Sequence, residues 1–276
     1  MRTALLQRSG SDDPGENLAS TREAVNAAAT DGAELIATPE VTNIVSASRT
    51  RQDEVLYHEG EDPTLATLRE VAAARSVHLL IGSLALRTDS EDGRFANRSF
   101  LIGPEGSILA RYDKIHMFDV AVSETETYRE SAGYRPGDLA VLAESALGRI
   151  GMTICYDLRF PSLYRTLARA GAEILTVPSA FSPVTGAAHW EPLLRARAIE
   201  TGCYVLAPAQ CGTHRASRGR ERRTYGHTLA VSPWGEVLCD GGELPGTSFV
   251  EIDLGEVARA RAKVPSLANE RPFRHP

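Results

Sequence analysis

The sequence predicts an α/β fold in a single domain that covers residues 1–276, and three observations lead to this prediction. Short apolar runs that are typical of strands alternate along the whole chain with segments of helical periodicity. No internal repeat, low-complexity tract or linker divides the chain. The predicted strands are also too numerous for one small sheet, so two stacked sheets covered by helices fit the pattern.

The first forty residues show the pattern clearly. Residues 2–6 are predicted to form a strand, and residues 16–29 carry apolar side chains at near-helical spacing up to a stop at Gly32. Residues 33–39 form a second predicted strand, which leaves Glu40 at its C-terminal end. Because a helix separates the two strands, they belong to an α/β unit rather than a hairpin.

The other elements are predicted from apolar runs for strands and from Asp, Pro or Gly at the ends of helical periods. Further strands are predicted over residues 78–86, 100–102, 107–111, 149–154, 173–178, 204–210, 226–232, 237–238 and 249–252. Further helices are predicted directly after Asp62 and over residues 161–170, 189–201 and 254–263. Residues 116–138 show no clean period and are predicted to form a long ordered loop, which inside a compact domain tends to be functional.

Composition and charge exclude several classes of protein. Hydrophobic residues make up 42% of the chain and charged residues 24%, which is typical of a globular protein. A formal charge of -6 argues against nucleic-acid binding, and no segment has the length of a membrane span or the features of a signal peptide. We therefore expect a cytoplasmic protein. Residues 215–223 hold five arginines, which indicates a solvated loop or, alternatively, a loop that receives an anionic substrate.

The four cysteines, at positions 155, 203, 211 and 239, are too few and too widely spread to stabilise a chain of this length by disulfide bonds. We therefore expect all of them to be reduced. The Asn97-Arg-Ser99 sequon is then not expected to be glycosylated, because glycosylation requires secretion. Cys203, Cys211 and His214 could be imagined as zinc ligands, but their spacing does not match the close cysteine pairs that structural zinc prefers. We therefore predict no metal site.

Cys155 is the candidate nucleophile. It lies between a predicted buried strand and a helix that begins at Pro161, whose N-terminal amides and dipole are expected to favour the thiolate. Glu40 and Lys114 also follow predicted strands, and strand ends are where α/β folds build sites. Each of these three residues, taken alone, has a simpler explanation. Cys155 could be a small buried side chain, Glu40 a cap and Lys114 a surface charge.

Three segments together resemble the signature segments of the nitrilase superfamily, the carbon-nitrogen hydrolases with a Glu-Lys-Cys triad. They are Thr38-Pro-Glu40, Arg111-Tyr-Asp-Lys114-Ile-His and Ile154-Cys-Tyr-Asp-Leu-Arg-Phe-Pro161, in the same order and spacing. The similarity runs from the first strand to the last. It implies a four-layer α-β-β-α sandwich, a small-molecule amide substrate, no metal or organic cofactor, and a homodimer or larger homo-oligomer. The charge and the lack of a membrane-length segment already argue against a nucleic-acid or membrane partner.

Further segments are similar to the Nit branch of this superfamily, and some of them most closely to the deaminated glutathione amidases. They cover residues 128–131, 178–191, 194–200, 209–212, 225–228 and 233–235. The ω-amidases, which hydrolyse α-ketoglutaramate and α-ketosuccinamate, are the close alternative, followed by other aliphatic amide or carbamoyl hydrolases. Thr228 departs from the serine of many relatives, but both residues are small and carry a hydroxyl group.

The resemblance implies a role for each matching residue. Glu40 would act as the general base on Cys155, which would attack the amide carbon and form a thioester. Lys114 and a backbone amide near Tyr156 would stabilise the oxyanion, and Glu130 would orient Lys114 and the substrate amide. The products would be a carboxylate and ammonia.

A substrate with a distal carboxylate also needs a cation. Arg159 is the first candidate and the arginines of residues 215–223 are the second, although Arg159 could instead form an internal salt bridge. Ser179, Phe181 and Thr185 are expected to bind substrate together with Tyr156. Two other hypotheses remain, namely an inactive binding protein with this fold and a hydrolase whose base is His189 or His227.

Overall fold

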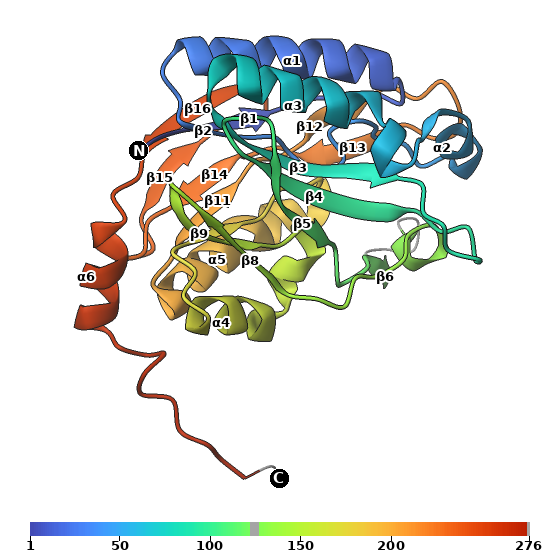
Figure 1. Cartoon of the computed structure of the whole chain (residues 1–276). Helices are drawn as coiled ribbons and strands as arrows, with labels where there is room; N and C mark the ends of the chain where they lie inside the picture. Colours follow the sequence, from blue (N-terminus) through green and yellow to red (C-terminus); the bar gives the residue numbers. More distant parts are fainter. Residues whose placement is uncertain (122–126, 275–276) are drawn as a thin grey trace.

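Two mixed β-sheets are stacked face to face, with helices on both outer faces (Figure 1). The computed structural model describes residues 1–121 and 127–274, and within them each of the two large sheets has six strands. The strand order is β16-β1-β2-β3-β4-β5 in the first sheet and β15-β14-β11-β10-β9-β8 in the second. This architecture confirms the predicted α-β-β-α sandwich.

Three central strands of each sheet are parallel, and helices connect them. The first sheet consists of β16 (Gly246–Glu251), β1 (Arg2–Gln7), β2 (Leu35–Ala37), β3 (His78–Leu86), β4 (Ala96–Ile102) and β5 (Ile108–Asp113). The second consists of β15 (Val237–Asp240), β14 (Leu229–Val231), β11 (Tyr204–Ala207), β10 (Ile174–Thr176), β9 (Gly148–Met152) and β8 (Val141–Ser145).

The helices form the two outer layers (Figure 1). Helices α1 (Pro14–Thr30) and α3 (Pro63–Arg75) cover the first sheet, and α4 (Pro161–Arg169) and α5 (Pro183–Thr201) cover the second. The smaller elements are α2 (Arg49–Val55), α6 (Gly255–Lys263), the strand pairs β6 (Asp119–Ala121) with β7 (Thr127–Arg129) and β12 (Cys211–His214) with β13 (Arg222–Tyr225), and the 3-10 helices η1 (Glu59–Glu61), η2 (Glu130–Ala132) and η3 (Cys155–Arg159).

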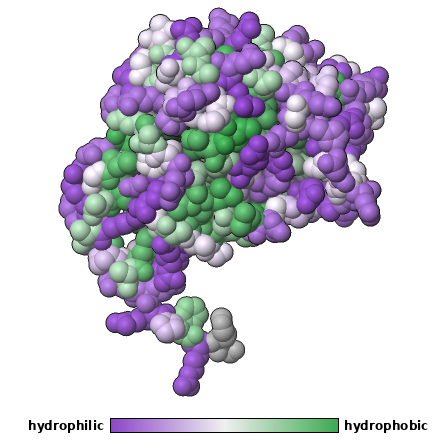
Figure 2. Space-filling model, viewed as in Figure 1, coloured by the Kyte–Doolittle hydropathy of each residue, from purple (hydrophilic) through white to green (hydrophobic). Residues whose placement is uncertain are grey.

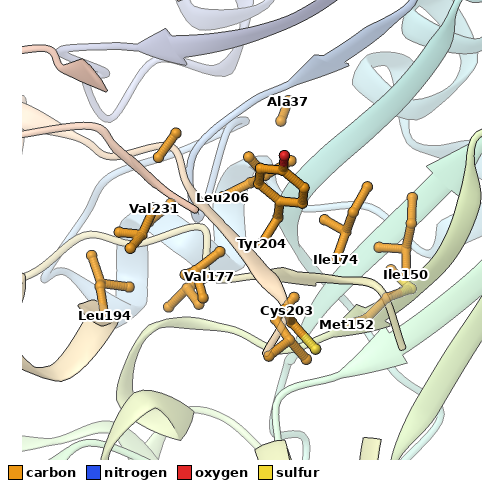
Figure 3. Packing of buried hydrophobic residues seen from close by; sticks show 14 of the residues in the cluster. Ala37, Ile150, Met152, Ile174, Val177, Leu194, Cys203, Tyr204, Leu206 and Val231 are labelled. Carbon is orange, nitrogen blue, oxygen red and sulfur yellow. The ribbon is translucent and has the colours of Figure 1, made fainter. Parts of the chain in front are cut away.

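The largest hydrophobic cluster lies between the sheets and continues beneath the second sheet. Ala37 of β2 belongs to this cluster together with Tyr204 and Leu206 of β11 and Leu194 of α5 (Figure 3). A second cluster joins the outer face of the first sheet to α1 and α3. Because both faces of the central strands are buried, these strands are apolar throughout, which is the signal by which the sequence predicts them.

The structure corrects two sequence predictions. The helix predicted over residues 189–201 begins six residues earlier, because Ser182 caps it and Pro183 suits its first position. The predicted loop of residues 116–138 contains the paired strands β6 and β7 and the helix η2, while its residues 122–126 lie outside the described part of the chain.

The sequence also gave no indication of several short elements. They are α2, β8, β12 and β13, in addition to the β6–β7 pair. Strand β8 pairs with β9 across a tight turn, and β12 pairs with β13, the next strand along the chain. Apart from β8, these segments are short and mostly polar, so they lack the apolar run or helical period from which the other elements were predicted.

The surface is mostly polar on the face in Figure 2, but apolar residues gather near the middle of this face, over the edge strands β5 and β8. Leu109 of β5 and Leu139, just before β8, are among the exposed large hydrophobic residues. None of the helices in the described ranges is long and apolar enough to cross a membrane.

Candidate active site

Four side chains from distant parts of the sequence meet beyond the ends of the strands. The Nζ atom of Lys114 lies 2.9 Å from Oε1 of Glu40 and 2.9 and 2.8 Å from the two carboxylate oxygens of Glu130. Cys155 lines the same cavity as these three residues, and burial together with the Glu40 carboxylate raises the pKa of its thiol. The structure thus brings together the four predicted catalytic residues, with one ammonium group between two carboxylates and the thiol beside the first of them.

The Glu40 carboxylate is held by further hydrogen bonds. The backbone N–H of Ala180 donates to Oε2 at 2.8 Å, and the side-chain amide of Asn97 donates to Oε1 at 2.9 Å. Asn97 also reaches Glu130 at 3.4 Å, and Gln210 donates to the backbone carbonyl of Glu40 at 3.0 Å. Sequence reasoning missed Asn97 and Gln210, since nothing local distinguishes them from other buried polar residues of a strand and a loop.

The backbone is strained next to both the acid and the nucleophile. Cys155 has a φ of 49° and Val41, directly after Glu40, has a φ of 48°, which are uncommon values for residues with a Cβ atom and especially for a β-branched one. The backbone N–H of Cys155 donates to Pro178 O at 3.0 Å and that of Val41 donates to Ser83 Oγ at 2.7 Å. These bonds hold the two turns that direct the side chains toward each other.

Gly82 of β3 lies where the segment that carries Glu40 and the segment of Pro178, which accepts the hydrogen bond from Cys155 N–H, approach this strand. A Cβ atom at this position would lie 2.0 Å from Thr38 O and 2.6 Å from the Cβ atom of Pro178. Only glycine leaves enough room for such a close approach. Because Gly82 has no side chain, these two segments can pack closely against β3 and form the site.

Asp157 links the turn of the nucleophile to the segment of Lys114. Its buried carboxylate accepts hydrogen bonds from Tyr112 Oη at 2.6 Å and from the backbone N–H of His116 at 3.0 Å, and it lies 2.7 Å from His116 Nδ1. Tyr112 and His116 flank Lys114 in the chain, while Asp157 is two residues after Cys155. The sequence motifs thus contain a positioning network as well as the reacting groups, and sequence reasoning missed this second role.

Burial and charge determine the protonation of the site. Burial and the Glu40 carboxylate raise the pKa of the Cys155 thiol, and the nearby Lys114 ammonium does not offset them. This direction is opposite to the thiolate that the sequence led us to expect. Cys155 is itself the first residue of η3, and its side chain is buried, so desolvation outweighs any effect of a helix dipole.

The pKa values of Glu40 and Lys114 are shifted in opposite directions. Burial alone would raise the pKa of Glu40, but the Lys114 ammonium and its hydrogen bond hold this pKa below the ordinary value. Burial alone would lower the pKa of Lys114, but the carboxylates of Glu130 and Glu40 raise this pKa well above the ordinary value. A neutral thiol therefore lies beside an ionised carboxylate, which is the arrangement that a general base requires.

The pKa shifts of Glu40, Lys114 and Cys155 predict that the activity depends little on pH. We expect kcat/KM for a primary amide to change by less than about threefold between pH 6 and pH 9, because Glu40 stays ionised, Lys114 stays protonated and Cys155 stays neutral throughout this range. Activity should decrease only as the pH falls below the ordinary range of a glutamate, where Glu40 takes up a proton. Initial rates across this pH range test the expectation, and a rise in kcat/KM centred near pH 8.5 would instead indicate a thiolate nucleophile.

The four side chains line a cavity of about 770 Å³. Tyr156, Phe181 and Thr185 line this cavity, as the sequence predicts for substrate-binding residues. Ser179 is a correction: it is fully buried, and its hydroxyl donates to Val177 O at 3.0 Å, so it supports the wall and cannot touch a ligand.

Arg159 does not lie among the residues that line the cavity. Its guanidinium lies 5.9 Å from the ring centroid of Tyr156 and 5.6 Å from that of Phe181, and its Nη atoms are 3.2 Å from His189 Nδ1. In the described part of the chain it forms no salt bridge either. Three arginines from the second predicted group do line the cavity, namely Arg220, Arg222 and Arg223.

The two histidines considered as alternative bases lie elsewhere. His189 contacts Arg159, and His227 pairs with Asp240 at 3.0 Å. Among the described residues that line the cavity, none is a histidine. The geometry therefore favours Glu40 over a histidine as the base.

Comparisons with known proteins agree with this geometry. The family model of the carbon-nitrogen hydrolases matches residues 2–262. The deaminated glutathione amidase of Yersinia enterocolitica is 38% identical over 97% of this chain and 92% of its own length. The NitFhit protein of C. elegans superimposes with a TM-score of 0.90 at 32% identity, over 98% of this chain but only 65% of its own chain.

An amidase from Nesterenkonia sp. AN1 is also similar in structure. A glutamate-to-glutamine mutant of it, with acrylamide added to the active-site cysteine, superimposes with a TM-score of 0.77 at 25% identity, over 96% of this chain and 98% of that one. Together with the family match over most of the chain, these similarities confirm the resemblance seen in the motifs. The chain belongs to the carbon-nitrogen hydrolase family of the nitrilase superfamily, and it is a hydrolase that acts on amide C–N bonds.

Proposed function

We propose that this protein hydrolyses a small amide with a carboxylate at its far end, and that Glu40, Lys114, Cys155 and Glu130 are its catalytic residues. The observation that most supports the proposal is that Cys155, whose thiol pKa is raised by burial and by Glu40, lines one cavity with Glu40, while Lys114 lies 2.9 Å from the Glu40 carboxylate. This arrangement supplies a nucleophile, its base and a cation for the developing oxyanion.

The first half-reaction forms a thioester. As the sulfur of Cys155 attacks the amide carbon, its proton passes to Glu40 and the carbonyl electrons move to the oxygen. The ammonium group of Lys114 and the backbone N–H of Tyr156, in the first turn of η3, stabilise this oxyanion. When the tetrahedral intermediate collapses, the C–N bond breaks and Glu40 returns the proton to the departing nitrogen.

The second half-reaction uses the same carboxylate with water. Glu40 accepts a proton from the water molecule that attacks the thioester carbon, and the new oxyanion lies at the same donors. Collapse breaks the C–S bond, and the proton returns from Glu40 to the sulfur. Glu130 keeps Lys114 in place throughout, through two hydrogen bonds of 2.9 and 2.8 Å.

Deaminated glutathione is the substrate that we propose, with α-ketoglutaramate as the alternative. The name of the Yersinia enterocolitica relative supports the first, and the cavity volume of about 770 Å³ is within the range of small-molecule sites. The two substrates differ in the departing group. Glutathione contains only secondary amides between its residues, so its deaminated form releases an amine, whereas α-ketoglutaramate releases ammonia.

A direct comparison of the two substrates tests the proposal. We expect kcat/KM for deaminated glutathione to exceed that for α-ketoglutaramate by at least about tenfold, with amine release from the first and ammonia release from the second. The Cys155→Ala variant, which lacks the nucleophile, should release neither product. A ratio near one would contradict the substrate preference, and rates negligible beside those of a nitrile or carbamoyl compound would contradict the substrate class.

We also propose that the enzyme works in the cytoplasm as a homodimer formed by single-domain chains. This part rests on the likeness to the Nit branch and on the reduced state expected for the four cysteines, none of which is paired in the structure.

A further inference from the structure

Arg222 is a cation in the wall of the cavity that carries the catalytic residues. It lies at the start of β13, which packs against the segment around Phe181, since the backbone N–H of Tyr225 donates to Phe181 O at 3.0 Å. This contact places Arg222 among the lining residues together with Ala180 and Phe181. Arg222 thus reaches the cavity from a strand that sequence reasoning did not predict.

The guanidinium of Arg222 has few partners for a group with five N–H donors. One Nη atom donates to Ala180 O at 2.6 Å, while Nε is buried and has no hydrogen-bond partner. Within residues 1–121 and 127–274, no carboxylate lies within salt-bridge distance of this group. Because an arginine stays charged, a half-buried guanidinium without an anion is costly, and the arrangement indicates a place for one.

The other arginines that line the cavity differ from Arg222. Arg49 is also half-buried, but it forms an ion pair with Asp53 and donates to Gly133 O. Arg129, Arg220 and Arg223 are exposed, so water already solvates their charges. Among the described lining residues, Arg222 is the one half-buried arginine without a carboxylate within salt-bridge distance.

Arg222 is also linked to the base. Ala180, which accepts the hydrogen bond from Arg222, donates its own N–H to Glu40 at 2.8 Å. The positive charge of Arg222 contributes to the lowered pKa of Glu40. An anion bound at Arg222 would offset this effect and make Glu40 a stronger base when the correct substrate is present.

We infer that Arg222 anchors the distal carboxylate of the amide substrate and thereby sets a preference for anionic over neutral amides. The inference deepens the proposed function and rests on it for the identity of the reacting amide. A guanidinium suits this role because its planar N–H groups match the two oxygens of a carboxylate. It also replaces Arg159, which lies outside the lining, as the first candidate for the clamp.

The first test measures a ratio of activities. The ratio of kcat/KM for α-ketoglutaramate to kcat/KM for butyramide, a neutral primary amide, should fall by about 30-fold in Arg222→Met, because a charge-assisted interaction is lost only with the anionic amide. Arg222→Lys should restore part of the ratio. Arg215→Met is the matched control, since Arg215 belongs to the same arginine-rich segment but pairs with Glu16 outside the cavity. An unchanged ratio in Arg222→Met overturns the inference, even if both activities fall together.

The second test does not depend on catalysis. Calorimetry measures the binding of α-ketoglutarate to the Cys155→Ala protein and to the same protein with Arg222→Met or Arg215→Met, each checked for folding by thermal melting. We expect Arg222→Met alone to weaken binding by at least about tenfold. Equal affinities, or no binding to the Cys155→Ala protein, overturn the inference. If Arg222-dependent binding is found but wild-type protein hydrolyses no amide, the anion site stands and the proposed function fails.

Discussion

Replacement of Glu40 by glutamine is expected to lower kcat by about 10³-fold or more. Glutamine has nearly the same shape and still accepts the hydrogen bond from Ala180 N–H, but it cannot take the proton of Cys155 or return it to the leaving group. Steady-state rates with the preferred amide measure the effect on kcat. The reaction of Cys155 with iodoacetamide should slow as well, because the raised pKa of the thiol leaves it dependent on this base.

The two histidine hypotheses provide the control for this experiment. His189→Asn and His227→Asn should each retain kcat within about threefold of the wild type, since neither residue lines the cavity. Asparagine is chosen because His227 has a φ of 55°, a left-handed conformation that asparagine tolerates. Loss of activity in a histidine variant together with an active Glu40→Gln protein would show that the base is a histidine.

Replacement of Lys114 by methionine is expected to affect both catalysis and stability. The loss of an oxyanion donor should lower kcat by about 10²-fold to 10³-fold. The free energy of unfolding at pH 7 should fall by about 3–5 kcal/mol, because two carboxylates, of Glu40 and Glu130, lose their shared cation in a site where Lys114 is only 2% exposed. Urea unfolding monitored by circular dichroism measures this stability.

The pH dependence of this loss has a definite sign. In the wild type the pKa of Glu40 is lowered by Lys114, so this ion pair stabilises the fold above the ordinary carboxyl pKa and its contribution declines as the pH falls through the lowered value. In Lys114→Met the carboxylates can take up protons more readily, so the deficit in stability should shrink toward pH 5. A deficit that stays constant would assign the effect to lost packing.

Lys263 is the natural control for Lys114. The sequence contains only these two lysines, and Lys263 lies at the end of α6 with its Nζ atom 5.3 Å from the ring centroid of Trp234. Lys263→Met should change the free energy of unfolding by less than about 1 kcal/mol and leave kcat unchanged. An equal loss of stability in both variants would show that the buried position of Lys114 has no special importance.

The cluster of Glu40, Lys114 and Cys155 could be predicted from the sequence because its parts are encoded locally. Glu40, Lys114 and Cys155 each follow an apolar strand, and strand ends are visible in the sequence as the end of a hydrophobic run. The motifs around these three residues also identified the family. The layered fold follows from the same strands, since central strands buried on both faces are apolar throughout.

Only the tertiary structure decided which side chains surround the centre and how they are protonated. Asn97 and Arg222 reach the cavity because their strands pack beside the distant segments of Glu40 and Phe181, so no local pattern assigns them to it. Arg159 was predicted from its place four residues after Cys155, but it lies outside the cavity lining. The neutral state of Cys155 depends on burial and on Glu40, more than a hundred residues away in sequence. Desolvation and charge act through space, and the distances on which they depend exist only after the two sheets have packed.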